Sequence, residues 1–188
     1  MKKTRIGITA TRLALVALSL FLWARAYQHF FFEGPYRSFF LDQALFGGIQ
    51  NLISDLSRLE FVRDPQTDRG ILFYTCFMAW VWLLTGLLVL GYRKVSGPLL
   101  WVLAILSSLG LMFYGVSDYL DKGYQLAQWL EYAAQIVMPI WVLYLLKKGP
   151  SGPLLFVAKG AIALTFLGHG LYAIGYFPVP GHFVYMTT

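Results

Sequence analysis

The chain has few charged residues and a single cysteine. Asp, Glu, Lys and Arg make up 13% of its 188 residues, whereas hydrophobic residues make up 58%. Soluble domains carry about 25% charged residues, so this deficit indicates lipid as the solvent. Cys76 alone cannot form an intramolecular disulfide, a CxxC redox pair or a zinc site built from cysteines. The sequence also lacks a flavin or nucleotide motif, and it therefore encodes no redox centre of its own.

The net charge of +6 does not indicate a nucleic-acid-binding protein. Its basic residues stand at the ends of apolar runs and are not gathered in one patch. This distribution is typical of residues that set membrane topology, and it offers no face for a phosphate backbone. We therefore expect a lipid bilayer as the partner and no nucleic acid.

Apolar runs predict an all-α membrane bundle in one domain, residues 1–188. A span needs about 20 apolar residues to cross the hydrocarbon core. The expected spans are residues 8–32, 71–91, 98–117, 126–146 and 154–177. An alternative for the first run is a signal peptide, because Ala24-Arg25-Ala26 resembles a cleavage site. The apolar and aromatic character continues beyond that site, which favours a retained span.

The long polar section after the first span predicts an amphipathic helix over residues 38–61. Leucine and isoleucine recur there at steps of three or four, with charged residues between them. Gly47-Gly48 would bend this helix, and 64–70 would form the loop that follows it. Such a helix is expected to lie on the membrane surface and cover the bundle.

Clusters of basic residues predict the orientation of the chain. With five spans, all of them fall on one side of the membrane, which the positive-inside rule assigns to the cytoplasm. The clusters are Lys2, Lys3 and Arg5, then Arg93 and Lys94, then Lys147 and Lys148. The N-terminus is thus expected inside a bacterial cytoplasmic membrane, with the amphipathic section and the C-terminus outside.

Two segments of the chain resemble each other. Ser96-Gly97-Pro98-Leu99-Leu100-Trp101-Val102 matches Ser151-Gly152-Pro153-Leu154-Leu155-Phe156-Val157, and each follows a basic pair. Proline stands in the first turn of each expected helix, where its missing N–H costs least. Spans two and three therefore look like a first copy of a hairpin and spans four and five like a second. We expect these four spans to form the core bundle. Tyr114 and Tyr172 correspond, whereas His169 matches Leu111.

Polar residues gather at one depth in the outer half of the membrane. Ionisable groups inside a span are costly and are functional candidates. The candidates for a polar pocket are Arg25, Gln28, His29, Asp118, Glu131, Gln135, His169 and Tyr172. We expect Arg25, Glu131 and His169 to converge, with Arg25 neutralised by Glu131. One interpretation is an outward-facing pocket under the amphipathic section and the turn 178–182. The other is a hydrogen-bond network that only ties helices together.

Some of the same residues are of the types that bind haem or a metal ion. His29 and His169 on two helices are compatible with a bis-histidine haem, although one such pair beside an arginine is weak support. A metal site from His29, Glu131, His169 and His182 follows no ligand-spacing motif. No motif encodes a cofactor, and catalytic residues cannot be assigned.

The first and last spans resemble the DoxX-like family of small bacterial membrane proteins. The similarity rests on Arg25-x-x-Gln28-His29 and on Ala163-Leu164-Thr165-Phe166-x-x-His169-Gly170-Leu171-Tyr172-Ala173. The resemblance implies a compact four-helix core and, for some relatives, a role as subunit of a quinone-linked oxidoreductase. On that reading His169 and Tyr172 would donate to a quinone, Arg25 would stabilise its reduced anion, and a redox partner would dock on the outer face. The fifth span and the long outer section depart from the family. The alternative is a non-catalytic scaffold or a small-solute handling protein.

Cysteine accessibility tests the expected topology. In a Cys76→Ala background, a Ser96→Cys variant should resist a membrane-impermeant maleimide added to intact cells, because Ser96 lies on the cytoplasmic side. A Ser57→Cys variant, in the outer section, should react and serves as the positive control. Labelling of the Ser96→Cys variant in intact cells contradicts the topology.

Overall fold

The computed structural model describes residues 5–53, 57–149 and 151–178, and all regular secondary structure within them is helical. The helices are α1 (Arg5–Phe31), α2 (Tyr36–Leu41), α3 (Gln43–Ile53), α4 (Arg58–Arg63), α5 (Pro65–Leu90), α6 (Gly97–Asp121), α7 (Leu126–Glu131), α8 (Ala133–Lys148) and α9 (Gly152–Ala173). The predicted all-α class is confirmed.

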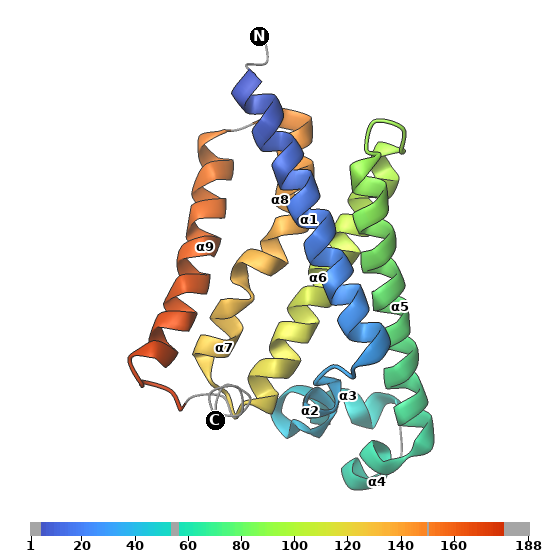
Figure 1. Cartoon of the computed structure of the whole chain (residues 1–188). Helices are drawn as coiled ribbons and strands as arrows, with labels where there is room; N and C mark the ends of the chain where they lie inside the picture. The colour runs from blue at the N-terminus through green and yellow to red at the C-terminus, as the bar shows by residue number, and fades with distance from the viewer. Residues whose placement is uncertain (1–4, 54–56, 150, 179–188) are drawn as a thin grey trace.

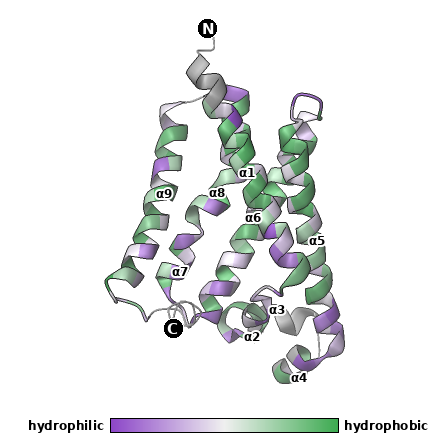
Figure 2. Cartoon of the chain, viewed as in Figure 1, coloured by the Kyte–Doolittle hydropathy of each residue, from purple (hydrophilic) through white to green (hydrophobic). Residues whose placement is uncertain are grey.

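Five helices are long and apolar enough to cross a membrane, as predicted. They are Ala10–Phe31, Pro65–Leu90, Gly97–Asp121, Leu126–Lys148 and Gly152–Ala173, the fourth comprising α7 and α8. They run side by side, with apolar residues along their length and more polar ones toward the ends (Figures 1 and 2). The chain is therefore an integral membrane protein.

The ends of the bundle differ in the way the sequence predicted. The start of α1 and the turns α5–α6 and α8–α9 lie at one end, and α2, α3 and α4 lie at the other (Figure 1). The basic residues of the two turns therefore share one end of the molecule. We call the end that carries α2–α4 the outer end.

The outer section forms short helices, so the prediction of one helix over 38–61 is wrong. The chain breaks at Asp42, whose carboxylate accepts a hydrogen bond of 2.8 Å from the backbone N–H of Leu45 and caps α3. Gly47 and Gly48 lie inside α3 and do not end it. Ser57 has extended backbone geometry and forms a capping box with Glu60, so a separate helix, α4, starts there.

The expected loop over residues 64–70 is the first part of α5. Asp64 accepts a hydrogen bond of 2.9 Å from the N–H of Gln66, and Pro65 occupies the first turn. A capping carboxylate followed by proline is a helix start signal. The second span therefore begins before the apolar run does.

The four-helix core contains the first span and leaves the fifth at its edge. Its buried residues come from α1, α5, α6 and α8, with Leu18, Leu22, Trp82, Leu111 and Val142 among them. Helix α9 packs against α7 and α8 and stands at the side of the bundle (Figure 1). The expectation that spans two to five form the core is therefore wrong, because the first span belongs to the core and the fifth does not.

Each of the two expected hairpins has a close helix–helix contact at a glycine. A Cβ atom at Gly110 of α6 would lie 2.1 Å from Met78 of α5, and one at Gly168 of α9 would lie 2.6 Å from the carbonyl oxygen of Ala127 in α7. In each hairpin a glycine thus lets the second helix approach the first. Tyr114 and Tyr172 follow these glycines by four residues and lie on the same faces.

The contact at Gly168 generates a stability prediction. Gly168→Ala forces a methyl group against backbone atoms and should lower the free energy of unfolding by about 1–3 kcal/mol. Gly170→Ala is the matched control, because a Cβ there meets nothing within 4 Å. Thermal unfolding in detergent measures both. Equal melting temperatures for the two variants would contradict the close approach of α9 to α7.

Candidate functional site

Arg25 lies at the centre of a hydrogen-bonded cluster in the outer half of the bundle. Its Nη1 donates to Oε1 of Gln28 at 2.7 Å and its Nη2 to Oε1 of Gln135 at 2.5 Å. The guanidinium carbon lies 4.8 Å from the ring centroid of Tyr114 and 5.3 Å from that of Tyr132. Amide oxygens and aromatic faces thus stabilise a cation that lipid would not solvate.

Hydrogen bonds extend the cluster to α6. Gln28 Nε2 donates to the hydroxyl of Tyr114 at 3.0 Å. The hydroxyl of Tyr132 donates to Oδ2 of Asp118, also at 3.0 Å. Asp118 is buried, with 8% of its surface exposed. The carboxyl group of Asp118 is therefore linked to the cluster through the hydroxyl of Tyr132.

His29 is buried on the outer side of this cluster, and its tautomer follows from its partners. Nδ1 lies 3.1 Å from the carbonyl oxygen of Arg25, which can only accept, so Nδ1 carries the proton. Nε2 then accepts from the hydroxyl of Tyr36 at 2.6 Å. Burial raises the pKa of Tyr36 well above its ordinary value, which keeps this hydroxyl protonated.

Glycine makes the position of Tyr36 possible. A Cβ atom at Gly34 would lie 2.5 Å from the Tyr36 ring. The ring turns back over this residue and packs against Tyr74 and Phe113 of the bundle. The turn after α1 therefore anchors the outer section to the core through one buried aromatic residue.

A second polar group lies between α7 and α9. Oε1 of Glu131 lies 3.0 Å from Nδ1 of His169, whose side chain is 59% exposed. The hydroxyl of Tyr172 lies 3.0 Å from Oε1 of Gln125 and 3.2 Å from Oε1 of Gln128. Gln128 Nε2 in turn lies 3.5 Å from Oε2 of Glu131.

The fourth span is interrupted between these two groups. Helix α7 ends at Glu131 and α8 begins at Ala133. Thr165 of α9 closes the gap, because its hydroxyl accepts from the N–H of Ala134 at 3.1 Å and donates to the carbonyl of Glu131 at 3.4 Å. A side chain inserted into the helical ladder is one of the recognised causes of such a break.

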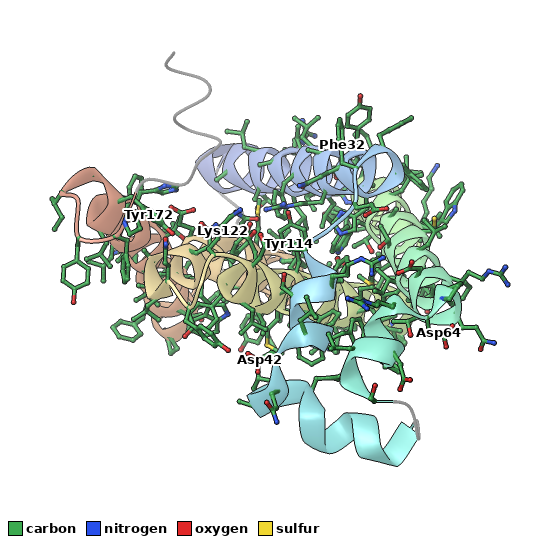
Figure 3. The ribbon with its side chains drawn as sticks, turned by 90° about the horizontal axis from the view of Figure 1, so that it is seen from below. Phe32, Asp42, Asp64, Tyr114, Lys122 and Tyr172 are labelled. Carbon is green, nitrogen blue, oxygen red and sulfur yellow. The ribbon has the colours of Figure 1, made fainter. Side chains whose placement is uncertain are left out.

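The structure divides the predicted pocket into two groups. We call the first the arginine cluster; it contains Arg25, Gln28, His29, Asp118 and Gln135, together with Tyr36, Tyr114 and Tyr132. We call the second the glutamate–histidine group; it contains Glu131, His169, Tyr172, Gln125 and Gln128. Seen from the outer end, Tyr114 lies near the centre of the bundle and Tyr172 at its α9 edge (Figure 3).

The expected pairing of Arg25 with Glu131 is wrong. Glu131 pairs with His169, and Arg25 donates to Gln135, one helical turn after Glu131. The reason is geometric, since α7, which ends at Glu131, packs against α9, whereas α8, which carries Gln135, also contacts α1. His182 and the rest of the turn beyond Pro178 lie outside the described residues.

Sequence reasoning missed several participants. Tyr132 follows Glu131 directly, and Tyr114 precedes Asp118 by one helical turn. Because residues four apart share a helix face, both tyrosines could have been predicted to lie near the polar residues. Thr165 and Tyr36 gave no such signal, because the first acts through a helix break and the second through a chain reversal. All four are neutral residues in aromatic or apolar surroundings.

Haem or metal ligation would compete with bonds already present. Both ring nitrogens of His29 are engaged, one with a backbone carbonyl and the other with Tyr36. Within the described part of the chain, no group of three or more His, Cys, Asp or Glu side chains is placed to hold a metal ion. His29 and His169 also belong to different groups.

A cavity of about 340 Å³ with polar and apolar walls opens at the outer end, beside His29 of the arginine cluster. It is lined by His29, Phe30, Phe31, Phe32, Glu33, Gly34, Arg37, Asp68, Arg69, Ile71, Leu72 and Thr75. Of the predicted pocket residues only His29 takes part. Arg37 of α2 pairs with Asp68 of α5, so the outer section contributes to this cavity.

The fold and the site thus define an integral membrane protein with a divided polar network. Comparisons of the chain with protein-family models, with curated proteins and with solved structures give no match.

The contacts of Arg25 generate a second stability prediction. Arg25→Leu leaves the oxygens of Gln28 and Gln135 without their donor and should cost about 2–4 kcal/mol. His169→Leu, at a largely exposed position, should cost about 1 kcal/mol or less. Unfolding in detergent compares them, with Arg25→Lys separating charge from the two-pronged geometry. Equal losses for the two leucine variants would contradict the assignment of Arg25 to the more buried cluster.

Proposed function

We propose that the chain is the membrane subunit of a quinone-linked redox system and holds a quinone head group at the glutamate–histidine group. The observation that carries this proposal is the pairing of His169 with Glu131 beside a broken span. Discontinuous helices inside membranes commonly border binding sites, because their freed backbone groups and nearby polar side chains can face a ligand.

His169 has a ring nitrogen available to a ligand. Nδ1 faces Glu131, whereas Nε2 makes no hydrogen bond within the described residues. A carboxylate beside a histidine fixes the orientation of the ring. A half-exposed imidazole of this kind can donate to a quinone carbonyl or accept a quinol proton. Tyr172, one helical turn away, supplies a hydroxyl.

Charge balance also favours proton exchange at this place. The two groups contain one fixed cation, Arg25, and two carboxyl groups, Asp118 and Glu131. Unbalanced charge is costly where water is scarce. The two groups therefore hold titratable side chains, His169 and the two carboxyl groups, that can exchange protons with a ligand. Quinone reduction consumes two electrons and two protons, so a site that holds an exchangeable proton suits this chemistry.

The electrons must come from a partner, since the sequence encodes no redox centre. We propose that a redox protein docks on the outer section α2–α4, where Leu41, Leu45 and Leu59 are exposed. The resemblance to DoxX-like proteins supports this assignment. Basic residues at the opposite end support a bacterial cytoplasmic membrane with the N-terminus inside.

A scaffold function is the second candidate, and the arginine cluster favours it. Arg25 donates to two amide oxygens and stacks on two rings, and both nitrogens of His29 are engaged. These residues tie α1 to the other helices without needing a ligand.

Quinone binding distinguishes the two candidates. We expect the full chain, purified in mild detergent, to carry a quinone detectable by mass spectrometry and to bind a short-chain quinone in titrations. His169→Ala should weaken binding about tenfold through loss of one hydrogen bond to the ligand. Phe166→Ala, an exposed position on the same helix, is the control.

A protein without quinone, whose His169→Ala variant is only less stable, leaves the scaffold function as the better explanation. An absorption spectrum of the same sample tests the haem interpretation, because a bound haem gives a Soret band.

A further inference from the structure

The cavity at the outer end lies at the boundary between hydrocarbon and water. Its walls are the end of α1, the turn that contains Gly34, and the first turns of α5. The first span ends at Phe31 and the second begins at Pro65. A molecule in this cavity would therefore have its polar part at the depth of lipid head groups.

Two cations and two anions line the cavity. Arg37 and Asp68 form an ion pair with each other, and each side chain is 47% exposed. Arg69 and Glu33 make no side-chain hydrogen bond or ion pair within the described residues. The cavity thus offers one positive group, Arg69, and one negative group, Glu33, that have no ion-pair partner among the described residues. The net charge of its four charged residues is zero.

An apolar wall completes the cavity on the membrane side. Phe31, Phe32 and Leu72 line it and are 68%, 61% and 58% exposed. These side chains would meet acyl chains in a bilayer. The cavities that lie between α6, α8 and α9, by contrast, are lined almost wholly by apolar side chains. The outer cavity therefore fits an amphipathic molecule and they do not.

We propose that this cavity binds a zwitterionic phospholipid head group that has a phosphate and a primary ammonium. The phosphate pairs with Arg69 and the ammonium with Glu33, while the acyl chains leave along Phe31 and Leu72. Arginine binds phosphate in its two-pronged geometry, and a primary ammonium has N–H donors for a carboxylate.

The balance of charges sets the specificity. An anionic head group would satisfy Arg69 but would meet Glu33 without a cation of its own. A choline head group has no N–H donor for Glu33. This inference uses residues outside the arginine cluster and the glutamate–histidine group, apart from His29 at the cavity wall, and it is independent of the proposed quinone function.

Lipid titration tests the inference. The full chain is delipidated in detergent, and phosphatidylethanolamine, phosphatidylglycerol or phosphatidylcholine is added while the melting temperature and bound lipid (native mass spectrometry) are followed. Phosphatidylethanolamine should bind most tightly and raise the melting temperature. Glycerophosphoethanolamine, the head group without acyl chains, should bind at least tenfold more weakly, because it lacks the apolar contacts.

Variants of the two unused charges locate the site. Arg69→Gln and Glu33→Gln should each weaken phosphatidylethanolamine binding about tenfold. Arg93→Gln, an exposed arginine at the opposite end, should have no effect. Glu33→Gln should also reduce the preference for phosphatidylethanolamine over phosphatidylglycerol. The melting temperatures of the lipid-free variants check that they fold.

Several results would overturn the inference. Equal binding of phosphatidylglycerol shows that charge balance does not select the ligand, and equal binding of phosphatidylcholine removes the role of the primary ammonium. Equal binding of glycerophosphoethanolamine shows that the site takes a soluble head group instead of a lipid. Unchanged binding by Arg69→Gln and Glu33→Gln places any bound lipid elsewhere.

Discussion

A peptide group released from a helix inside a membrane has no water to bond, and this constraint governs the centre of the structure. The fourth span breaks between Glu131 and Ala133, and the Thr165 hydroxyl binds the carbonyl of Glu131 and the N–H of Ala134 beside the break. One small side chain on α9 thus permits α7 to lean toward α9 while α8 stays with α1. The division of the polar residues into two groups depends on this break.

The same constraint explains why the polar side chains are so well paired. Arg25 has amide oxygens at its nitrogens and rings on its faces, and Asp118 accepts the hydroxyl of a buried tyrosine. Each of these bonds joins two different helices or two turns of one helix. Their strength comes less from each bond than from the cost of leaving a polar group in hydrocarbon. Among the described residues, the exceptions are Trp23 Nε1, Ser108 Oγ and Ser117 Oγ, which are buried without a hydrogen-bond partner. His169, by contrast, reaches the surface and keeps one ring nitrogen available for a ligand.

The sequence alone predicted the parts of the fold that hydropathy controls. The number of spans, the gathering of basic residues at one end of the bundle and the depth of the polar residues follow from long apolar runs, basic clusters and the positions of ionisable residues. It did not predict which spans form the core, because α9 is as apolar as the others and only its neighbours distinguish an edge position. The single outer helix was wrong for a related reason. Leucines at helical spacing indicate which side of a helix is apolar. They do not show that Asp42 ends one helix and caps the next within the same segment.

The position of α9 has a consequence for the order of assembly. The residues that form the core all precede it in the chain, so α1, α5, α6 and α8 can pack before α9 has left the ribosome and entered the membrane. Its buried residues are Ala161 and Gly168, both small. Helix α9 can therefore join a surface that already exists, and Thr165 reaches the break in the fourth span only when α9 docks. Until then the freed backbone groups of Glu131 and Ala134 lack their partner. A helix that is synthesised after the fourth span thus completes the hydrogen bonding of that span.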